Sequence, residues 1–172
     1  HINLARKAAE ESMVLIKNDK ILPFKKDSNL KIGVVGRIAN VKNTGDRGSS
    51  DSRAPYVITP LEGVKDYHRN SKNKVIYSDA SNINDAIEIA KNVDQLIIVV
   101  GYTYKNEGEF IDAPGYKIGG DRISLKLEEN DEKLIQELSD YNTNLVVVYV
   151  GGSAIDMNNW EDKVPSILFS WY

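Results

Sequence analysis

The sequence lacks cysteine altogether, and histidine is almost as scarce. The missing thiols exclude disulfide bonds, thiolate nucleophiles and the commonest structural zinc sites. The two histidines, His1 at the amino terminus and His68 at the end of an expected helix, support neither a catalytic base nor a transition-metal site. Carboxylates are therefore the reactive groups that remain, and we expect no metal and no cofactor. The composition leaves a cytoplasmic and a secreted location equally open.

Long apolar runs and dense basic runs are also missing. No stretch approaches the roughly 20 apolar residues that span a bilayer, and the first residues have no secretory-signal layout. The formal net charge is −3, without a Lys/Arg cluster of the kind that binds nucleic-acid backbones. We expect a soluble chain that binds neither membranes nor nucleic acids.

Nucleotide-binding and serine-hydrolase motifs are absent as well. The turn after the first expected strand, Gly36-Arg37-Ile38-Ala39-Asn40, has neither the G-x-G-x-x-G pattern nor a P-loop. The segment Gly151-Gly152-Ser153-Ala154-Ile155 lacks the second glycine of a nucleophile elbow.

What the chain does contain is a regular alternation of strand and helix patterns. Apolar spacing over residues 1–17 predicts an amphipathic helix, followed by a connector around Pro23. The five expected strands are short β-branched or apolar runs: 31–36, 74–77, 95–101, 144–151 and 165–171. The three expected helices between them have Pro or Asn start signals and apolar residues three and four apart: 59–67, 82–92 and 130–141.

This alternation of strands and helices predicts an α/β fold with a mostly parallel sheet sandwiched between helices, since parallel strands need crossover connections. We expect a leading helix and linker over residues 1–30 and the sandwich domain over residues 31–172. Because the sequence starts without Met and stops on the apolar run 167–172, we expect a piece of a longer polypeptide. The domain is then truncated at its carboxyl end, with five strands in this chain and a sixth outside it.

The most chemically suggestive segment is the loop that follows the apolar strand 95–100. In doubly wound sheets, functional residues lie beyond the carboxyl ends of the strands, and loops as long as 37–60 and 102–130 are often functional. An extended segment would place Glu107 and Glu109 on the same side, whereas a kink at Gly108 would let the backbone expose either one. Two close carboxyls raise one another's pKa, which suits a general acid. On spacing alone a solvated acidic loop is the favoured interpretation, and Asp121-Arg122 and Asp46-Arg47 also fit ordinary loop pairs or turns.

Five segments, in one order, resemble family 3 glycoside hydrolases, the β-glucosidase and β-xylosidase group. Glu107-Gly108 with Gly120-Asp121-Arg122 resembles the E-G-x-D-R-x-x-L-x-L region of that family, although residues 109–119 intervene here. The other four matching segments are 4–23, 31–36, 45–63 and 151–172. The resemblance covers nearly the whole chain and identifies it with the second domain of these enzymes.

The resemblance implies a retaining β-glycosidase that acts on a terminal β-linked sugar of a glycoside or oligosaccharide. In this family a (β/α)8 barrel, absent here, supplies an Asp nucleophile, and the second domain supplies a Glu acid/base. That position falls on Glu107, with Glu109 as the competing candidate. The isolated chain is then expected to be inactive, because it holds only one of the two carboxyls that the reaction needs.

Loop position and resemblance together suggest further roles. Asp46, Arg47 and Ser49 are expected to line the sugar site, and Asp121 and Arg122 to order the acid/base loop, although Arg122 could equally be purely structural. The aromatic residues Tyr102, Tyr104 and Phe110 are candidates for stacking on a sugar ring. Two alternatives stay open: a non-catalytic carbohydrate-binding or scaffolding domain, and a flavodoxin-like ligand-binding domain.

Overall fold

A computed structural model of the protein describes residues 1–24, 29–44, 53–114, 116–120 and 122–172. Among these residues, six strands form one sheet in the order β1-β8-β7-β4-β2-β3. All neighbours are parallel except β1 and β8, which are antiparallel. The strands are β1 (Val14–Asn18), β2 (Lys31–Val35), β3 (Lys74–Ser78), β4 (Gln95–Gly101), β7 (Leu145–Val150) and β8 (Ser166–Phe169).

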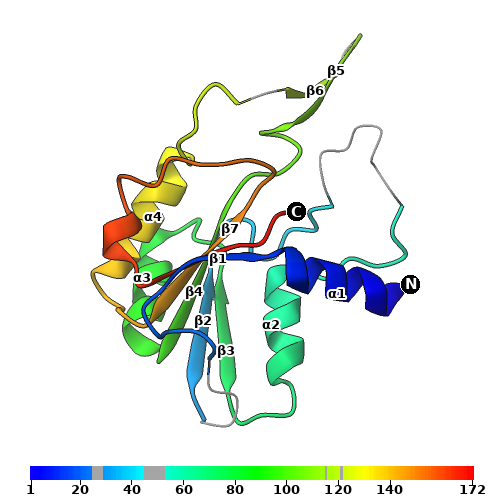
Figure 1. Ribbon diagram of the computed structural model, residues 1–172. Coiled ribbons are helices and arrows are strands. Elements are labelled where there is room, and N and C mark those ends of the chain that lie inside the picture. The colour runs from blue at the N-terminus through cyan, green and yellow to red at the C-terminus, as the bar shows by residue number, and fades with distance from the viewer. Residues whose placement is uncertain (25–28, 45–52, 115, 121) are drawn as a thin grey trace.

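Helices cover both faces of this sheet (Figure 1), which confirms the expected α/β sandwich. The described helices are α1 (Ile2–Ser12), α2 (Pro60–His68), α3 (Ile83–Asn92), α4 (Glu129–Ser139) and a 3-10 turn, η1 (Glu161–Lys163). None of them is long and apolar enough to cross a membrane.

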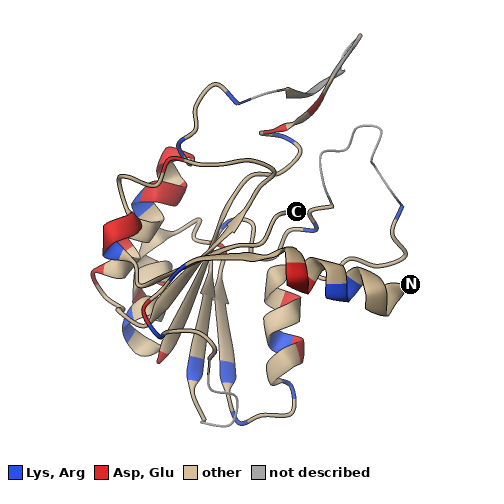
Figure 2. Ribbon diagram, in the orientation of Figure 1, with Lys and Arg blue, Asp and Glu red and all other residues tan. Residues whose placement is uncertain are grey.

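The alternation of side chains along each strand divides the core into two layers. Leu96, Ile98 and Val100 of β4 pack with α3 and α4, whereas Ile97 and Val99 pack on the opposite face with Leu61 of α2. Figure 2 shows the strands almost free of charged side chains, with Lys31 and Lys74 at the amino ends of β2 and β3. Strands that are apolar on both faces are typical of a buried parallel sheet, as the sequence predicts.

The position of the sixth strand is the main correction to the sequence analysis. Residues 14–17 were expected to end the leading helix, but residues 14–18 form β1 and pair with β8 inside this chain. Met13 has extended backbone angles, φ −59° and ψ 140°, and it ends α1. The apolar run Val14-Leu15-Ile16 favours a strand once an edge is available, and this tertiary pairing overrides the helical spacing.

A two-stranded hairpin is the other unpredicted element. The strands β5 (Gly108–Ala113) and β6 (Tyr116–Gly120) pair antiparallel with each other and project beyond the carboxyl edge of the main sheet (Figure 1). The Pro-Gly dipeptide at residues 114–115 was the available turn signal in the sequence. This hairpin accounts for residues 109–119, the insertion relative to the family motif.

Candidate functional site

The carboxylate of Glu107 is the centre of a polar cluster at the carboxyl edge of the sheet. Glu107 immediately precedes β5, and its side chain is only 12% exposed. The turn that carries it follows β4 and is held by the Glu107 N–H donating to the Thr103 carbonyl, at 3.2 Å. Asn106 fixes the same turn to the start of α4, since its Nδ2 donates to Glu128 Oε1 at 2.6 Å.

Both oxygens of Glu107 accept hydrogen bonds from groups distant in sequence. The Gly152 N–H, just after β7, donates to Oε1 at 2.5 Å, and the hydroxyl of Tyr172, just after β8, donates to the same oxygen. Arg122 Nε lies 2.6 Å from Oε2, and the Ser153 hydroxyl makes a longer contact of 3.4 Å with that oxygen. The carboxylate therefore joins the ends of β7 and β8 to the segment that follows the hairpin.

Arg122 is itself fixed by several contacts. Its side chain is 8% exposed, its Nη2 donates to the carbonyl of Ala154 at 3.0 Å and to the Ser153 hydroxyl, and its guanidinium lies 4.3 Å from the ring centre of Tyr102. A charged pair this deeply buried is stable only when its remaining hydrogen-bonding groups are satisfied. Arg122 and Glu107 meet this condition together.

Burial and negative charge keep the neighbouring phenols protonated. Burial is the largest cause that raises the pKa of Tyr172, and the hydrogen bond and charge of Glu107 raise it further. Burial likewise raises the pKa of Tyr149, whose hydroxyl donates to the Ser153 carbonyl at 2.9 Å. Both phenols are therefore hydrogen-bond donors across the physiological pH range.

Gly152 leaves the space that this cluster needs. A Cβ atom at this position would lie 2.8 Å from Cε2 of Tyr172 and 3.5 Å from Oε1 of Glu107. Any side chain here would push the tyrosine away from the carboxylate. Gly152, Ser153 and Tyr172 had no expected role, although they follow strands at the edge where ligands bind in such sheets.

The structure places the other expected site residues as follows. Asp46, Arg47, Ser49 and Asp121 lie outside the described residues. Glu109 and Phe110 are exposed on β5, and Tyr104 is half-buried in the turn after β4. The expectation that Tyr102 stacks on a sugar is wrong, because its ring is buried between Arg122 and the edge-on ring of Tyr149.

The ordering role expected of Arg122 remains a prediction, now with a defined contact. Its ion pair is with Glu107, the candidate acid/base residue itself. Within the part of the chain that the structure describes, no group of three His, Asp or Glu side chains is arranged to hold a metal ion.

Fold and site together define a parallel α/β sandwich domain that carries a buried carboxylate site at its carboxyl edge. The chain belongs to the glycosyl hydrolase family 3 C-terminal domain, whose sequence profile matches residues 13–172.

Known relatives are longer enzymes. The chain is 33% identical over 195 residues to beta-glucosidase BoGH3A of Bacteroides ovatus, matching 100% of this chain and 25% of that enzyme. It is 31% identical over 176 residues to the exo-1,4-beta-xylosidase xlnD of Emericella nidulans, matching 99% of this chain and 20% of that enzyme. The solved β-glucosidase EmGH1 of Erythrobacter marinus superimposes with a TM-score of 0.83 and 25% identity, covering 100% of this chain and 26% of that one. The chain thus spans between a fifth and about a quarter of these relatives.

Proposed function

We propose that the chain is the acid/base-bearing domain of a retaining β-glycosidase, and that Glu107 is the acid/base. The observation that supports Glu107 over Glu109 is the convergence of Arg122, Gly152 and Tyr172 on its carboxylate. Catalytic carboxyls work only when neighbouring groups hold them in a fixed orientation. Glu109, exposed on β5, does not have this buried setting.

In the proposed reaction, a nucleophilic carboxylate on a separate barrel domain attacks the anomeric carbon of the sugar. Glu107 donates its proton to the leaving oxygen and then takes one from the water that hydrolyses the glycosyl-enzyme. Both oxygens of Glu107 accept protein donors in this structure, so proton transfer requires one contact to be exchanged for the substrate. Tyr172 is 39% exposed, and in the proposed reaction its hydroxyl gives up its place on Oε1 to the leaving oxygen.

The test uses a chimera in which this chain replaces the matching domain of BoGH3A. For Glu107→Gln we expect a loss of about a hundredfold or more on an alkyl β-glucoside, whose leaving group needs protonation. The loss should be far smaller on a dinitrophenyl β-glucoside, whose leaving group departs unaided. Added azide should restore turnover of the activated substrate and yield the glycosyl azide.

Glu109→Gln is the matched control and should keep near-normal rates on both substrates. The same selective loss in Glu109→Gln, with Glu107→Gln unaffected, would transfer the assignment to Glu109. An equal loss on both substrates in Glu107→Gln, without azide rescue, would mean that Glu107 only supports the structure.

One observation also fits a non-catalytic carbohydrate-binding domain. A buried carboxylate with an arginine and three other donors is what a structural ion pair requires. In that case the chimera would hydrolyse neither substrate, although the chain would fold with its Glu107 contacts intact.

A further inference from the structure

A cavity of about 610 Å³ lies at the same edge of the sheet and shares no lining residue with the Glu107 cluster. Its walls come from Arg37 after β2, from residues 79–81 after β3, from Ile83 at the start of α3 and from one side of α4 between Asn130 and Glu137. The chain order reverses at this edge, since β2 has β3 on one side and β4 on the other. Ligands of doubly wound sheets bind at such a reversal, and the volume is in the usual range for a small ligand.

Polar groups at the edge of this cavity have free hydrogen-bonding capacity. Nη2 of Arg37 donates to the Gly101 carbonyl at 2.7 Å and to Asp131 Oδ2 at 3.2 Å, while its Nε and Nη1 make no hydrogen bond to any described residue. Asp79 accepts the Ser81 N–H through Oδ1 at 2.9 Å, and its hydrogen bonds with the backbone and side chain of Ser81 lower the pKa of this carboxyl, so it is a charged acceptor at the cavity edge. Arg37 is 40% exposed, whereas the Asp131 carboxylate that fixes it is 4% exposed.

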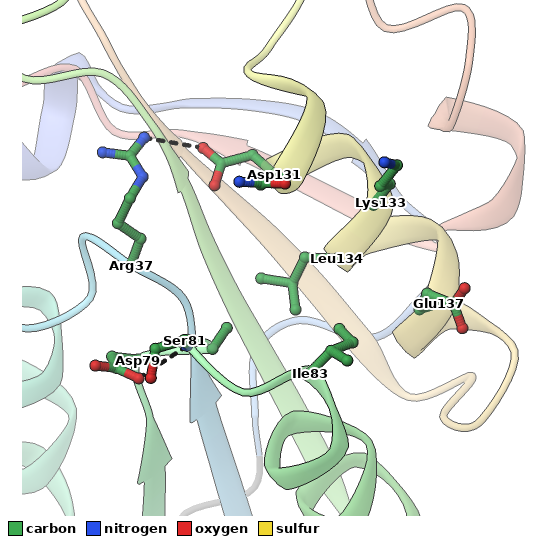
Figure 3. A pocket seen from close by; sticks show the side chains of 10 residues that line it. Arg37, Asp79, Ser81, Ile83, Asp131, Lys133, Leu134 and Glu137 are labelled. Carbon is green, nitrogen blue, oxygen red and sulfur yellow. Dashed lines mark hydrogen bonds and ion pairs between the residues drawn. The ribbon is translucent and has the colours of Figure 1, made fainter.

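The floor between these groups is apolar. In the view of Figure 3, Leu134 and Ile83 lie between Arg37 on one side and Glu137 on the other. Leu134 is buried in the core and therefore rigid, whereas Ile83 is 39% exposed at the cavity. A ligand with one apolar face and polar groups around its rim would be complementary to this arrangement.

The charges around the cavity are of both signs, which disfavours a simple ion as its ligand. An anion would meet the carboxylates of Asp79, Asp131 and Glu137, and a cation would meet Arg37 and Lys133. A neutral molecule whose hydroxyls both donate and accept can satisfy the two kinds of group together. We propose that this cavity is a binding site for a neutral sugar, at the size of a mono- or disaccharide, separate from the catalytic carboxylate. The proposal stands whether or not the chain takes part in catalysis.

The test is an NMR titration of the isotope-labelled chain with cellobiose and with xylobiose. We expect amide shifts in Ser81, Ile83 and Leu134 with a Kd of about 1 mM, a usual affinity for a small polar ligand in an open site. Asp79→Asn and Glu137→Gln each remove a charged acceptor at an exposed position, so the fold should persist. The double variant that carries both substitutions should bind either disaccharide about tenfold or more weakly.

Glu10→Gln, which removes an exposed carboxylate of α1 away from the cavity lining, is the control and should leave this titration unchanged. Amide shifts confined to Gly152 and Tyr172 would overturn the proposal, because they would place the sugar at Glu107. The absence of shifts, or a stronger response to inorganic phosphate than to either sugar, would overturn it as well.

Discussion

At the residue scale, the pair of Arg122 and Glu107 should dominate local stability. Their side chains are 8% and 12% exposed, so removing one partner leaves the other charge buried and uncompensated. We expect Arg122→Met to lower the free energy of unfolding by about 3 kcal/mol, measured by urea denaturation. Arg122→Met combined with Glu107→Gln should cost less than the sum of the two single changes, since the pair acts as a unit.

The matched control is Arg69→Met. Arg69 pairs with Asp66 at 3.1 Å, but both side chains are about two-thirds exposed, at 68% and 67%. Exposed pairs contribute less than about 1 kcal/mol. Equal losses in the Arg69 and Arg122 variants would contradict the importance assigned to the buried pair.

Gly152 permits a second prediction at this scale. Gly152→Ala places a Cβ atom 2.8 Å from the Tyr172 ring, so we expect a loss of about 1 to 3 kcal/mol from overpacking. Gly63→Ala in α2 is the comparison, because its nearest neighbour would be 3.9 Å away and alanine favours a helix by about 0.5 to 1 kcal/mol. The two alanine variants should shift the thermal midpoint in opposite directions, and a stabilised Gly152→Ala would show that Tyr172 is not held against Glu107.

At the element scale, the amino end of α2 shows how local sequence can fix a boundary. The Thr59 hydroxyl accepts the Glu62 N–H at 3.2 Å, and the Thr59 N–H donates to the Glu62 carboxylate at 2.8 Å. The backbone and side-chain hydrogen bonds of Thr59 lower the pKa of Glu62 from 4.5. The pKa of Glu62 is lower in the folded chain than in the unfolded chain, so this pair stabilises the fold at pH values above the unfolded-state pKa. The stabilisation is lost as the pH falls through the folded-state pKa of Glu62.

We therefore expect Glu62→Gln to lower the thermal midpoint near neutral pH. The difference from the unchanged chain should shrink toward zero at about pH 2, where Glu62 is protonated and resembles glutamine. Glu10→Gln on the exposed surface of α1 is the matched control for the loss of one negative charge from a helix. A difference that grows on acidification would contradict the capping contact.

The elements that the sequence could predict are those whose signals are local. Thr59-Pro60 starts α2, Asn82 caps α3, and the apolar run 95–100 forms the central strand. The strand 14–18 could not be predicted in the same way, because its pairing partner β8 is about 150 residues away, with Val14 opposite Phe169.

At the scale of the whole molecule, the difference between local signals and contacts distant in sequence also explains how much of the candidate site the sequence could predict. Glu107 was identifiable from its acidic loop and family motif, but its partners Gly152 and Tyr172 are 45 and 65 residues away. Only the strand order β4-β7-β8 brings the three together, since β4, β7 and β8 are adjacent and parallel. The order of strands in a parallel sheet therefore determines which loop residues lie next to one another and can form a site.

The surroundings of Glu107 also bear on whether the chain can act alone. A retaining mechanism needs a second carboxylate about 5 Å from the acid/base. The groups that contact Glu107 here are donors: the guanidinium of Arg122, the N–H of Gly152 and the hydroxyl of Tyr172. We expect the purified chain to release no nitrophenol from a nitrophenyl β-glucoside, while its chimera with the rest of BoGH3A releases it. Release by the chain alone that survives Glu107→Gln combined with Glu109→Gln would contradict a shared active site, because it would require a complete catalytic pair elsewhere in these 172 residues.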